Sequence, residues 1–216
     1  MVESADDWAE TRSRSWTSLP AWSPEADPFK VSAALLLHVN VHIAAINQLN
    51  LRVLYATTEK KRVDNDLLCR AEAKHGIDDL LSAMDYCAFA VYESKYCPYA
   101  GSPQPHADVG RHRRIYFPYP LKGEGQAGFL TRASKTSSPG FVRFFAPYFF
   151  SPRHPQAGWL RLAHELGTES RHRMLSLTHV GRLGYGFRGT DYTLTMFLVL
   201  ARRGAGRILR EAKRRV

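Results

Sequence analysis

A long amphipathic segment, from about Asp64 to Lys95, constrains the fold of this chain more than any other feature. Its apolar residues recur at spacings of three and four, which places them on one face of an α-helix. A helix of this length needs other helices to cover such a stripe. The sequence therefore predicts a helical bundle built around this segment. The residues of the stripe are Ile77, Leu80, Leu81, Met84, Ala88 and Val91.

Asp85 lies at the edge of this apolar stripe, about 40° from Leu81 on a helical wheel of 100° per residue. A carboxylate in such a position is costly unless another group pairs with it. We therefore expect Asp85 to belong to a buried polar centre, and its candidate partners are His172 and Arg173.

Three further segments are predicted to be helical. The first begins at Asp27 or Pro28, runs to about Tyr55 and is apolar around most of its circumference, which is typical of a central helix. The charged patch Glu59–Arg62 then marks a turn. The other two helices are expected at the start of Phe141–Phe150 and over Gln156–Leu166, where Gly167 is a natural C-terminal stop.

Other segments favour strands or loops. Residues 97–140 are rich in Pro and Gly and are interrupted by a β-prone stretch, Arg114–Phe117. Met174–Val180 and Tyr192–Leu200 have strand-like patterns. We therefore expect an α+β fold, mainly α: an antiparallel helical bundle with a small β element, forming one domain over residues 29–200.

The net charge of +10 is unevenly distributed. Residues 1–28 hold six acids and two arginines, a net charge of −4, so the remainder carries +14. Residues 202–216 hold seven basic residues and one Glu, which gives +6. A basic C-terminal tail over residues 201–216 attracts polyanions such as RNA or DNA. Alternatively, these residues form a solvated, fraying helix that only aids solubility, and the sequence favours neither interpretation.

Residues 1–28 are predicted to form a flexible acidic arm, because Pro20, Pro24 and Pro28 interrupt any helix. The arm also carries Trp8, Trp16 and Trp22, and such side chains usually pack against something. We therefore expect the arm to contact its own domain, a second copy in a homodimer, or a protein partner.

The sequence favours a cytoplasmic location. The acidic N-terminal residues are unlike a secretory signal, and the three cysteines are widely spaced, which is typical of free thiols in a reducing compartment. Residues 31–49 are apolar, but four polar residues interrupt them, so a buried helix is favoured over a transmembrane span. The interrupting residues are His38, Asn40, His42 and Asn47.

The sequence indicates no cofactor.

Two motifs that resemble ligand sites lack the context those sites need. Gly123, Gly125 and Gly128 match G-x-G-x-x-G, but prolines precede them instead of a buried strand, so a loop is favoured over a dinucleotide site. His164-Glu165 resembles the start of H-E-x-x-H, but the required second histidine is Thr168.

His38 and His42, four residues apart on one helix, could share a metal ion. No nearby carboxylate or cysteine completes the set in the sequence, and two packed core histidines are the favoured interpretation. No metal site is therefore expected.

Two basic clusters suit a nucleic-acid surface. Arg111, Arg113 and Arg114 lead into aromatic residues, so that charges could contact phosphates and rings could stack on bases. A solvated loop explains this first cluster equally well.

In the second cluster, Arg171 precedes His172 and Arg173, and His179 follows. Arginine binds phosphate and histidine exchanges protons near neutral pH, the minimum equipment for metal-free RNA cleavage.

The layout resembles a loose group of uncharacterised bacterial helical proteins related to HEPN bundles. The matching segments are Ala83-Met84-Asp85, Tyr116-Phe117-Pro118, Ala146-Pro147-Tyr148 and Ser170-Arg171-His172-Arg173. Leu81 and Ser170 stand where the group has an arginine and an acid. The resemblance implies a pairing of Asp85 with His172 or Arg173.

In HEPN ribonucleases the active pair is an arginine and a histidine separated by four to six residues, usually completed across a dimer. Arg173 and His179 match that spacing. On a strand, at roughly 3.3 Å per residue, the two would lie about 20 Å apart and could not act on one phosphate. On a helix they would be about 9 Å apart, so catalysis requires a helix where the pattern favours a strand.

Three hypotheses follow. The first is a nucleic-acid or polyanion binding module that uses Arg111, Arg113, Arg114, Arg171 and the basic tail. The second is a metal-independent ribonuclease of a defence or toxin type, with His172, Arg173 and His179 in the catalytic roles. The third is a structural interaction domain whose Trp-rich arm docks on a partner.

Overall fold

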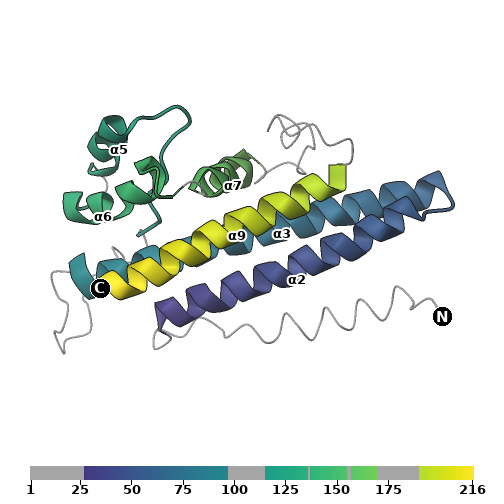
Figure 1. Ribbon diagram of the computed structural model, residues 1–216, viewed down its shortest axis with the longest axis horizontal. Coiled ribbons are helices and arrows are strands. Elements are labelled where there is room, and N and C mark those ends of the chain that lie inside the picture. The colour runs from purple at the N-terminus through teal and green to yellow at the C-terminus, as the bar shows by residue number, and fades with distance from the viewer. Residues whose placement is uncertain (1–26, 97–114, 136, 155–156, 170–189) are drawn as a thin grey trace.

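The computed structural model describes residues 27–96, 115–135, 137–154, 157–169 and 190–216. Within these residues the protein is almost entirely helical, and no strand occurs among them. The expectation of a mainly helical bundle is therefore confirmed. Its three long helices lie side by side, and the shorter helices pack along one side of them (Figure 1).

The first two long helices form an antiparallel pair. Helix α2 (Pro28–Leu54) starts with Asp27 as its N-cap, whose carboxylate accepts a hydrogen bond from the Phe29 N–H at 2.9 Å. Helix α3 (Glu59–Val91) starts with Thr58 as its N-cap and continues into a π-helical turn, η1 (Tyr92–Tyr96). The predicted turn at Glu59–Arg62 is wrong, because Thr58 caps the helix and these charged residues form its first turn.

Helix α9 (Thr190–Arg215) is the third long helix and packs against both α2 and α3. It runs antiparallel to α2 and parallel to α3 (Figure 1). The predicted strand at Tyr192–Leu200 is wrong, because this stretch lies within α9. Its β-branched and aromatic residues favour a strand locally, but apolar side chains at spacings of three and four give the helix a face to bury. Those buried residues are Phe197, Leu198, Ala201, Ala205, Ile208, Leu209 and Ala212.

The structure has no boundary at residue 201, where the sequence suggested that a basic tail begins. Residues 201–215 continue α9, and Ile208 is only 2% exposed. At the end of the helix, the Arg215 guanidinium lies over the Phe144 ring, 4.1 Å from its centroid, and Nη1 donates to Tyr148 Oη at 3.3 Å. The basic residues therefore sit on a helix that is packed into the domain.

Three short helices cover one side of the long ones (Figure 1). They are α5 (Gln126–Ala133), α6 (Pro139–Phe150) and α7 (Ala157–Glu169). Helix α7 continues past Gly167, so the predicted stop there is wrong. Gly167 is buried, and a Cβ on it would lie 2.4 Å from Leu81 Cδ1. The glycine therefore allows α7 to approach α3 closely.

An extended segment, Ile115–Leu121, contacts both layers: Asp85 of α3 on one side, and ring side chains of α6 and α7 on the other. Phe117 and Tyr119 are buried, and the β-prone residues at the start of the segment led to the predicted strand at Arg114–Phe117. No strand is assigned over Ile115–Leu121, and Arg114 lies outside the described residues. The predicted strand at Met174–Val180 also lies outside them.

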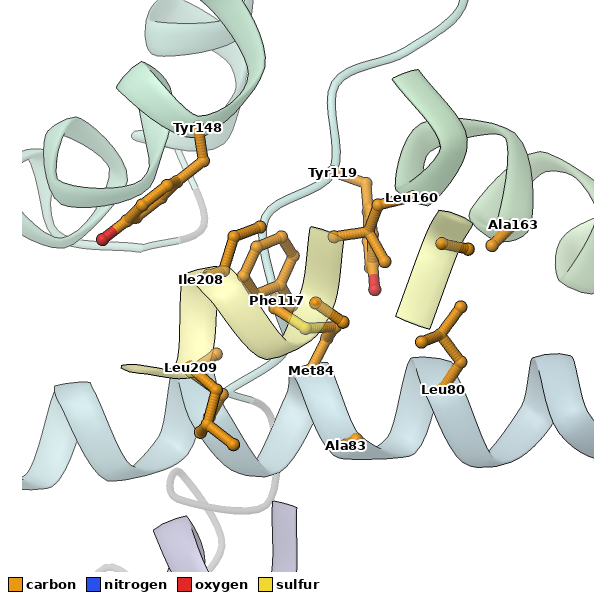
Figure 2. Close-up of a cluster of buried hydrophobic side chains, with 14 of the residues drawn as sticks. Leu80, Ala83, Met84, Phe117, Tyr119, Tyr148, Leu160, Ala163, Ile208 and Leu209 are labelled. Atoms are coloured by element: carbon orange, nitrogen blue, oxygen red, sulfur yellow. The ribbon is translucent and has the colours of Figure 1, made fainter. Parts of the chain in front are cut away.

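The core includes residues of every described α-helix, and one part of it lies where α3, α6, α7, α9 and the extended segment meet. Figure 2 shows side chains from all five around Met84, which is completely buried. The labelled members are Leu80, Ala83, Met84, Phe117, Tyr119, Tyr148, Leu160, Ala163, Ile208 and Leu209. The core therefore depends on segments from both halves of the chain.

Among the described helices, α2 is long and apolar enough to cross a membrane by length and composition. In this structure its buried face packs against α3 and α9. Three of the four polar residues that argued against a span contact other helices: His38 and His42 contact carboxylates of α3, and Asn47 Oδ1 accepts a hydrogen bond from Thr195 of α9 at 3.2 Å.

Candidate functional site

Polar contacts follow the seam between α2 and α3 at four levels. The Ser32 hydroxyl donates to the Ala83 carbonyl at 2.7 Å, and the Cys69 thiol donates to Asn50 Oδ1 at 3.1 Å. Between these two levels lie contacts of His38 and His42 with carboxylates of α3. The seam is therefore held in register by polar groups as well as by apolar packing.

The histidine contacts form a compact cluster, here called the His–carboxylate cluster: His38, His42, Glu72, His75 and Asp79. His42 is central to it. Its Nδ1 lies 2.7 Å from Glu72 Oε2, and its Nε2 lies 3.2 Å from Asp79 Oδ2. His38 Nδ1 lies 2.5 Å from the same Asp79 oxygen. One carboxylate oxygen thus faces two imidazoles from α2.

Most of the cluster is shielded from water. The side chain of His42 is 6% exposed, that of His38 13% and that of Asp79 20%. The ring of His42 packs edge-on against His38, with centroids 4.8 Å apart, and lies 5.9 Å from the ring of His75. Buried polar groups interact more strongly than exposed ones because water screens them less.

Gly76 brings the two helices close at this point. A Cβ there would lie 3.3 Å from His42 Cβ and 3.2 Å from Leu198 Cδ1 of α9. Because residue 76 carries no side chain, α3 can approach His42 closely. His42 therefore reaches Glu72, one turn before Gly76, and Asp79, about one turn after it.

Burial alone would lower the pKa of His42, but its hydrogen bonds to Asp79 and Glu72 outweigh burial and raise the pKa from 6.5 to about 9. For Asp79, burial acts to raise the pKa, and the hydrogen bonds from His42 and His38 more than offset it, so the pKa is lowered. Without a bound ion, His42 is therefore an imidazolium between two carboxylates near neutral pH.

The cluster corrects one argument from the sequence. His38 and His42 were interpreted as packed core histidines because no carboxylate near them in the sequence completed a ligand set. The structure supplies Glu72 and Asp79 from the neighbouring helix. The signal was present as Glu72, His75 and Asp79, whose spacings of three and four place them on one face of a helix.

A second candidate surface is the outer face of α9. Four arginines recur there at spacings of four, three and four, within about 60° of the helix circumference. We call this the α9 arginine stripe: Arg203, Arg207, Arg210 and Arg214. Three of them are exposed, and Arg207 is half-buried and pairs with Glu211 at 3.0 Å. Because the opposite face of α9 is buried, the stripe is fixed toward the outside.

More positive charge surrounds the C-terminal half of the stripe. Burial lowers the pKa of His154, and the nearby Arg207, Arg153 and Arg215 lower it further, against the opposing effect of Glu211. Lys95 donates to the Arg215 carbonyl at 3.0 Å, which brings the end of η1 to the end of α9. Cations near a helix C-terminus also interact favourably with the helix dipole.

Asp85 has a structural contact that the sequence did not indicate. Its Oδ1 accepts a hydrogen bond from the backbone N–H of Phe117 at 2.9 Å. This contact joins two of the segments on which the HEPN resemblance rests. The expected partners, His172 and Arg173, lie outside the described residues, so their pairing with Asp85 stays a prediction.

The remaining predicted site residues are also outside the described part of the chain. They are Arg111, Arg113 and Arg114 in one segment and Arg171 and His179 in another. The two weak motifs lie within the described residues. Gly125 is the N-cap of α5, and the ring of His164 stacks on Tyr119 with centroids 4.2 Å apart, so both contribute to the fold.

No protein-family model matches this sequence, and the searches of curated proteins and of solved structures give no significant match. The resemblance to HEPN bundles therefore stays a prediction, and functional inference rests on the chain's own residues.

Proposed function

We propose that this protein is a nucleic-acid or polyanion binding module that contacts its ligand through the α9 arginine stripe. The observation that carries the proposal is the register of the four arginines on a helix whose opposite face is buried. Such a helix presents its charges without the entropic cost of ordering a flexible tail on binding.

The dimensions of the stripe suit an extended polyanion. Arg203 and Arg214 are eleven residues apart, which at about 1.5 Å per residue is a rise of roughly 16 Å. At about 3.4 Å per phosphate, a stacked strand places roughly five phosphates over that length. Arginine is well suited to this contact, because its planar guanidinium binds phosphate oxygens through two N–H groups.

The test is binding of labelled single-stranded RNA to the full chain across a range of salt concentrations. Arg203→Gln, Arg210→Gln and Arg214→Gln are combined in one variant. The matched control combines Lys60→Gln, Lys61→Gln and Arg62→Gln, three exposed residues at the start of α3. Both variants lose three positive charges, but the control residues lie at the other end of the bundle (Figure 1).

We expect the stripe variant to lose at least about tenfold in affinity for RNA. The slope of log affinity against log salt concentration should also become shallower by about two, since fewer counterions are released on binding. The control variant keeps both within error. Equal losses in the two variants would mean that net charge, and not the stripe, governs binding. The same incubation, in the presence of EDTA, also tests for cleavage of the RNA. Cleavage by the wild-type chain that is lost in His172→Ala or His179→Ala would favour the ribonuclease hypothesis instead.

A further inference from the structure

We infer that His38, His42 and Asp79 form a binding site for a divalent transition-metal ion such as Zn²⁺, with Glu72 as the group that orients His42. The site is separate from the α9 arginine stripe and does not depend on polyanion binding. Two histidines come from one face of α2, and the carboxylate comes from the facing side of α3.

The donor atoms lie close to, but not at, the separations that a metal ion requires. A ligand atom from each of the three residues lies within 4.8 Å of the other two. His38 Nδ1 and His42 Nε2 are 2.5 and 3.2 Å from Asp79 Oδ2. In a tetrahedral site with bonds of about 2.05 Å, neighbouring ligand atoms lie about 3.3 Å apart. Small side-chain rotations therefore suffice to admit an ion.

The set of donors indicates the class of metal. Imidazole nitrogens suit Zn²⁺, Fe²⁺, Co²⁺ and Ni²⁺, whereas Ca²⁺ and Mg²⁺ prefer sites made of oxygen. Two histidines and one carboxylate are three protein ligands, which leaves further coordination positions for water or another small molecule. The site therefore has the composition of an open centre and not of a closed structural one.

Glu72 completes the arrangement on the far side of His42. Its Oε2 lies 2.7 Å from His42 Nδ1, while His42 Nε2 faces Asp79. A histidine that binds a metal through one ring nitrogen usually donates the other N–H to a carboxylate or carbonyl, which fixes the ring and its tautomer. Glu72 occupies that position.

A second set of donors shares His42. Ligand atoms of His42, Glu72 and His75 also lie within 4.8 Å of one another. A neutral imidazole has one nitrogen lone pair for a metal, so His42 can serve only one of the two sets at a time. We assign the ion to the His38 side, because there His42 keeps Glu72 as its hydrogen-bond acceptor. One ion per chain follows.

The test is a titration of the full chain, stripped of metal with EDTA and dialysed, with Co²⁺ followed by its visible absorption and with Zn²⁺ by competition. We expect one equivalent to bind and the wild-type melting temperature to rise on binding. A wild-type chain that binds no Co²⁺ or Zn²⁺ at micromolar concentration would overturn the inference, whatever the variants do.

The variants separate the roles of the residues. His38→Gln, His42→Gln and Asp79→Asn are expected to lose at least about 100-fold in affinity, while Glu72→Gln loses about 10–100-fold, as loss of an orienting group does. His75→Gln leaves affinity unchanged. His154→Gln is the matched control, because His154 is also mostly buried and lies beside a glutamate, 3.7 Å from Glu211.

Two further outcomes would overturn the assignment. Loss of binding in Glu72→Gln and His75→Gln, with His38→Gln and Asp79→Asn intact, would place the ion in the other set. Binding that all of these variants retain would place it elsewhere in the chain. Circular dichroism shows whether each variant is folded, and because three separate ligand variants exist, unfolding of one leaves the test in place.

Discussion

The Asp85 carboxylate of α3 accepts a hydrogen bond from the backbone N–H of Phe117, 2.9 Å away, and so ties the extended segment Ile115–Leu121 to the longest helix. Phe117 is only 3% exposed. A backbone N–H on such a buried residue needs an acceptor, and the half-buried Asp85 carboxylate supplies it.

Asp85→Ala is therefore expected to destabilise the protein by about 1–3 kcal/mol, the cost of a buried donor that loses its acceptor. Urea denaturation followed by circular dichroism gives the free energy of unfolding. Asp85→Asn is the control, because it keeps a carbonyl oxygen that can accept the bond, and it should cost less. A loss below about 0.5 kcal/mol for the alanine variant, the level of an ordinary surface substitution, would contradict the role of Asp85.

Two glycines of α7 should respond to alanine in opposite directions. Gly158 is exposed, with no atom near its Cβ position, so Gly158→Ala should stabilise the protein through helix propensity, by less than the roughly 1 kcal/mol of a helix interior because it lies in the first turn of α7. At Gly167 the new Cβ would meet Leu81 at 2.4 Å and Ile77 at 3.3 Å. Overpacking of a core typically costs about 1–3 kcal/mol, so Gly167→Ala should destabilise it.

The measurement is the difference between the two variants in urea denaturation. Both substitutions make the same chemical change in a terminal turn of the same helix, so helix propensity favours alanine in each. Equal and favourable effects would mean that α7 does not pack on α3 as closely as the structure places it.

A truncation after Leu200 tests whether residues 201–216 are a tail or part of the core. Burial of one large aliphatic side chain is worth about 1.5–3 kcal/mol, and the truncation removes both Ile208 and Leu209. The two together are worth about 3–6 kcal/mol, a large share of the stability of a typical domain, about 5–15 kcal/mol. We expect the truncated chain to lose cooperative thermal unfolding, measured by circular dichroism.

The control for this truncation keeps α9 but removes charge. The combined Arg203→Gln, Arg210→Gln and Arg214→Gln variant changes only exposed side chains, so its melting temperature should stay within a few degrees of wild type. A truncated chain that still unfolds cooperatively would support a dispensable tail.

Cys87 should be inert in the folded protein. Its side chain is completely buried, and that burial raises the pKa of the thiol to about 12. Since only the thiolate reacts, roughly one molecule in 10,000 would be reactive at pH 8 even if the reagent reached it. Native labelling with iodoacetamide, mapped by mass spectrometry, should leave Cys87 unmodified, and labelling in urea should modify it. Rapid native modification would contradict its burial.

The sequence predicted the helices best where one periodicity dominates. The apolar face around Ile77, Leu80 and Met84 is indeed buried on α3, and α2 does begin at Pro28, with Asp27 as its N-cap. The prediction was wrong for Tyr192–Leu200, because local strand propensity and helical periodicity compete there. Helical periodicity prevails because α9 can bury its apolar residues between α2 and α3, a fact that no local pattern contains.

The His–carboxylate cluster was missed for a different reason. His42 and Glu72 are thirty residues apart in the chain, and their contact depends on the register of the α2–α3 pair. That register follows from the short connection between Leu54 and Glu59 together with Gly76, which permits the close approach. Spacing within each helix could suggest donors, but only the pairing of the helices brings them together.

The position of α9 in the core has a consequence for synthesis of the protein. Helix α3 ends at Val91, and α9 begins at Thr190, so the ribosome makes about a hundred residues between them. At roughly 5–20 residues per second this takes about 5–20 s. Throughout that interval the nascent α2 and α3 lack the third long helix that packs against both of them in the folded protein.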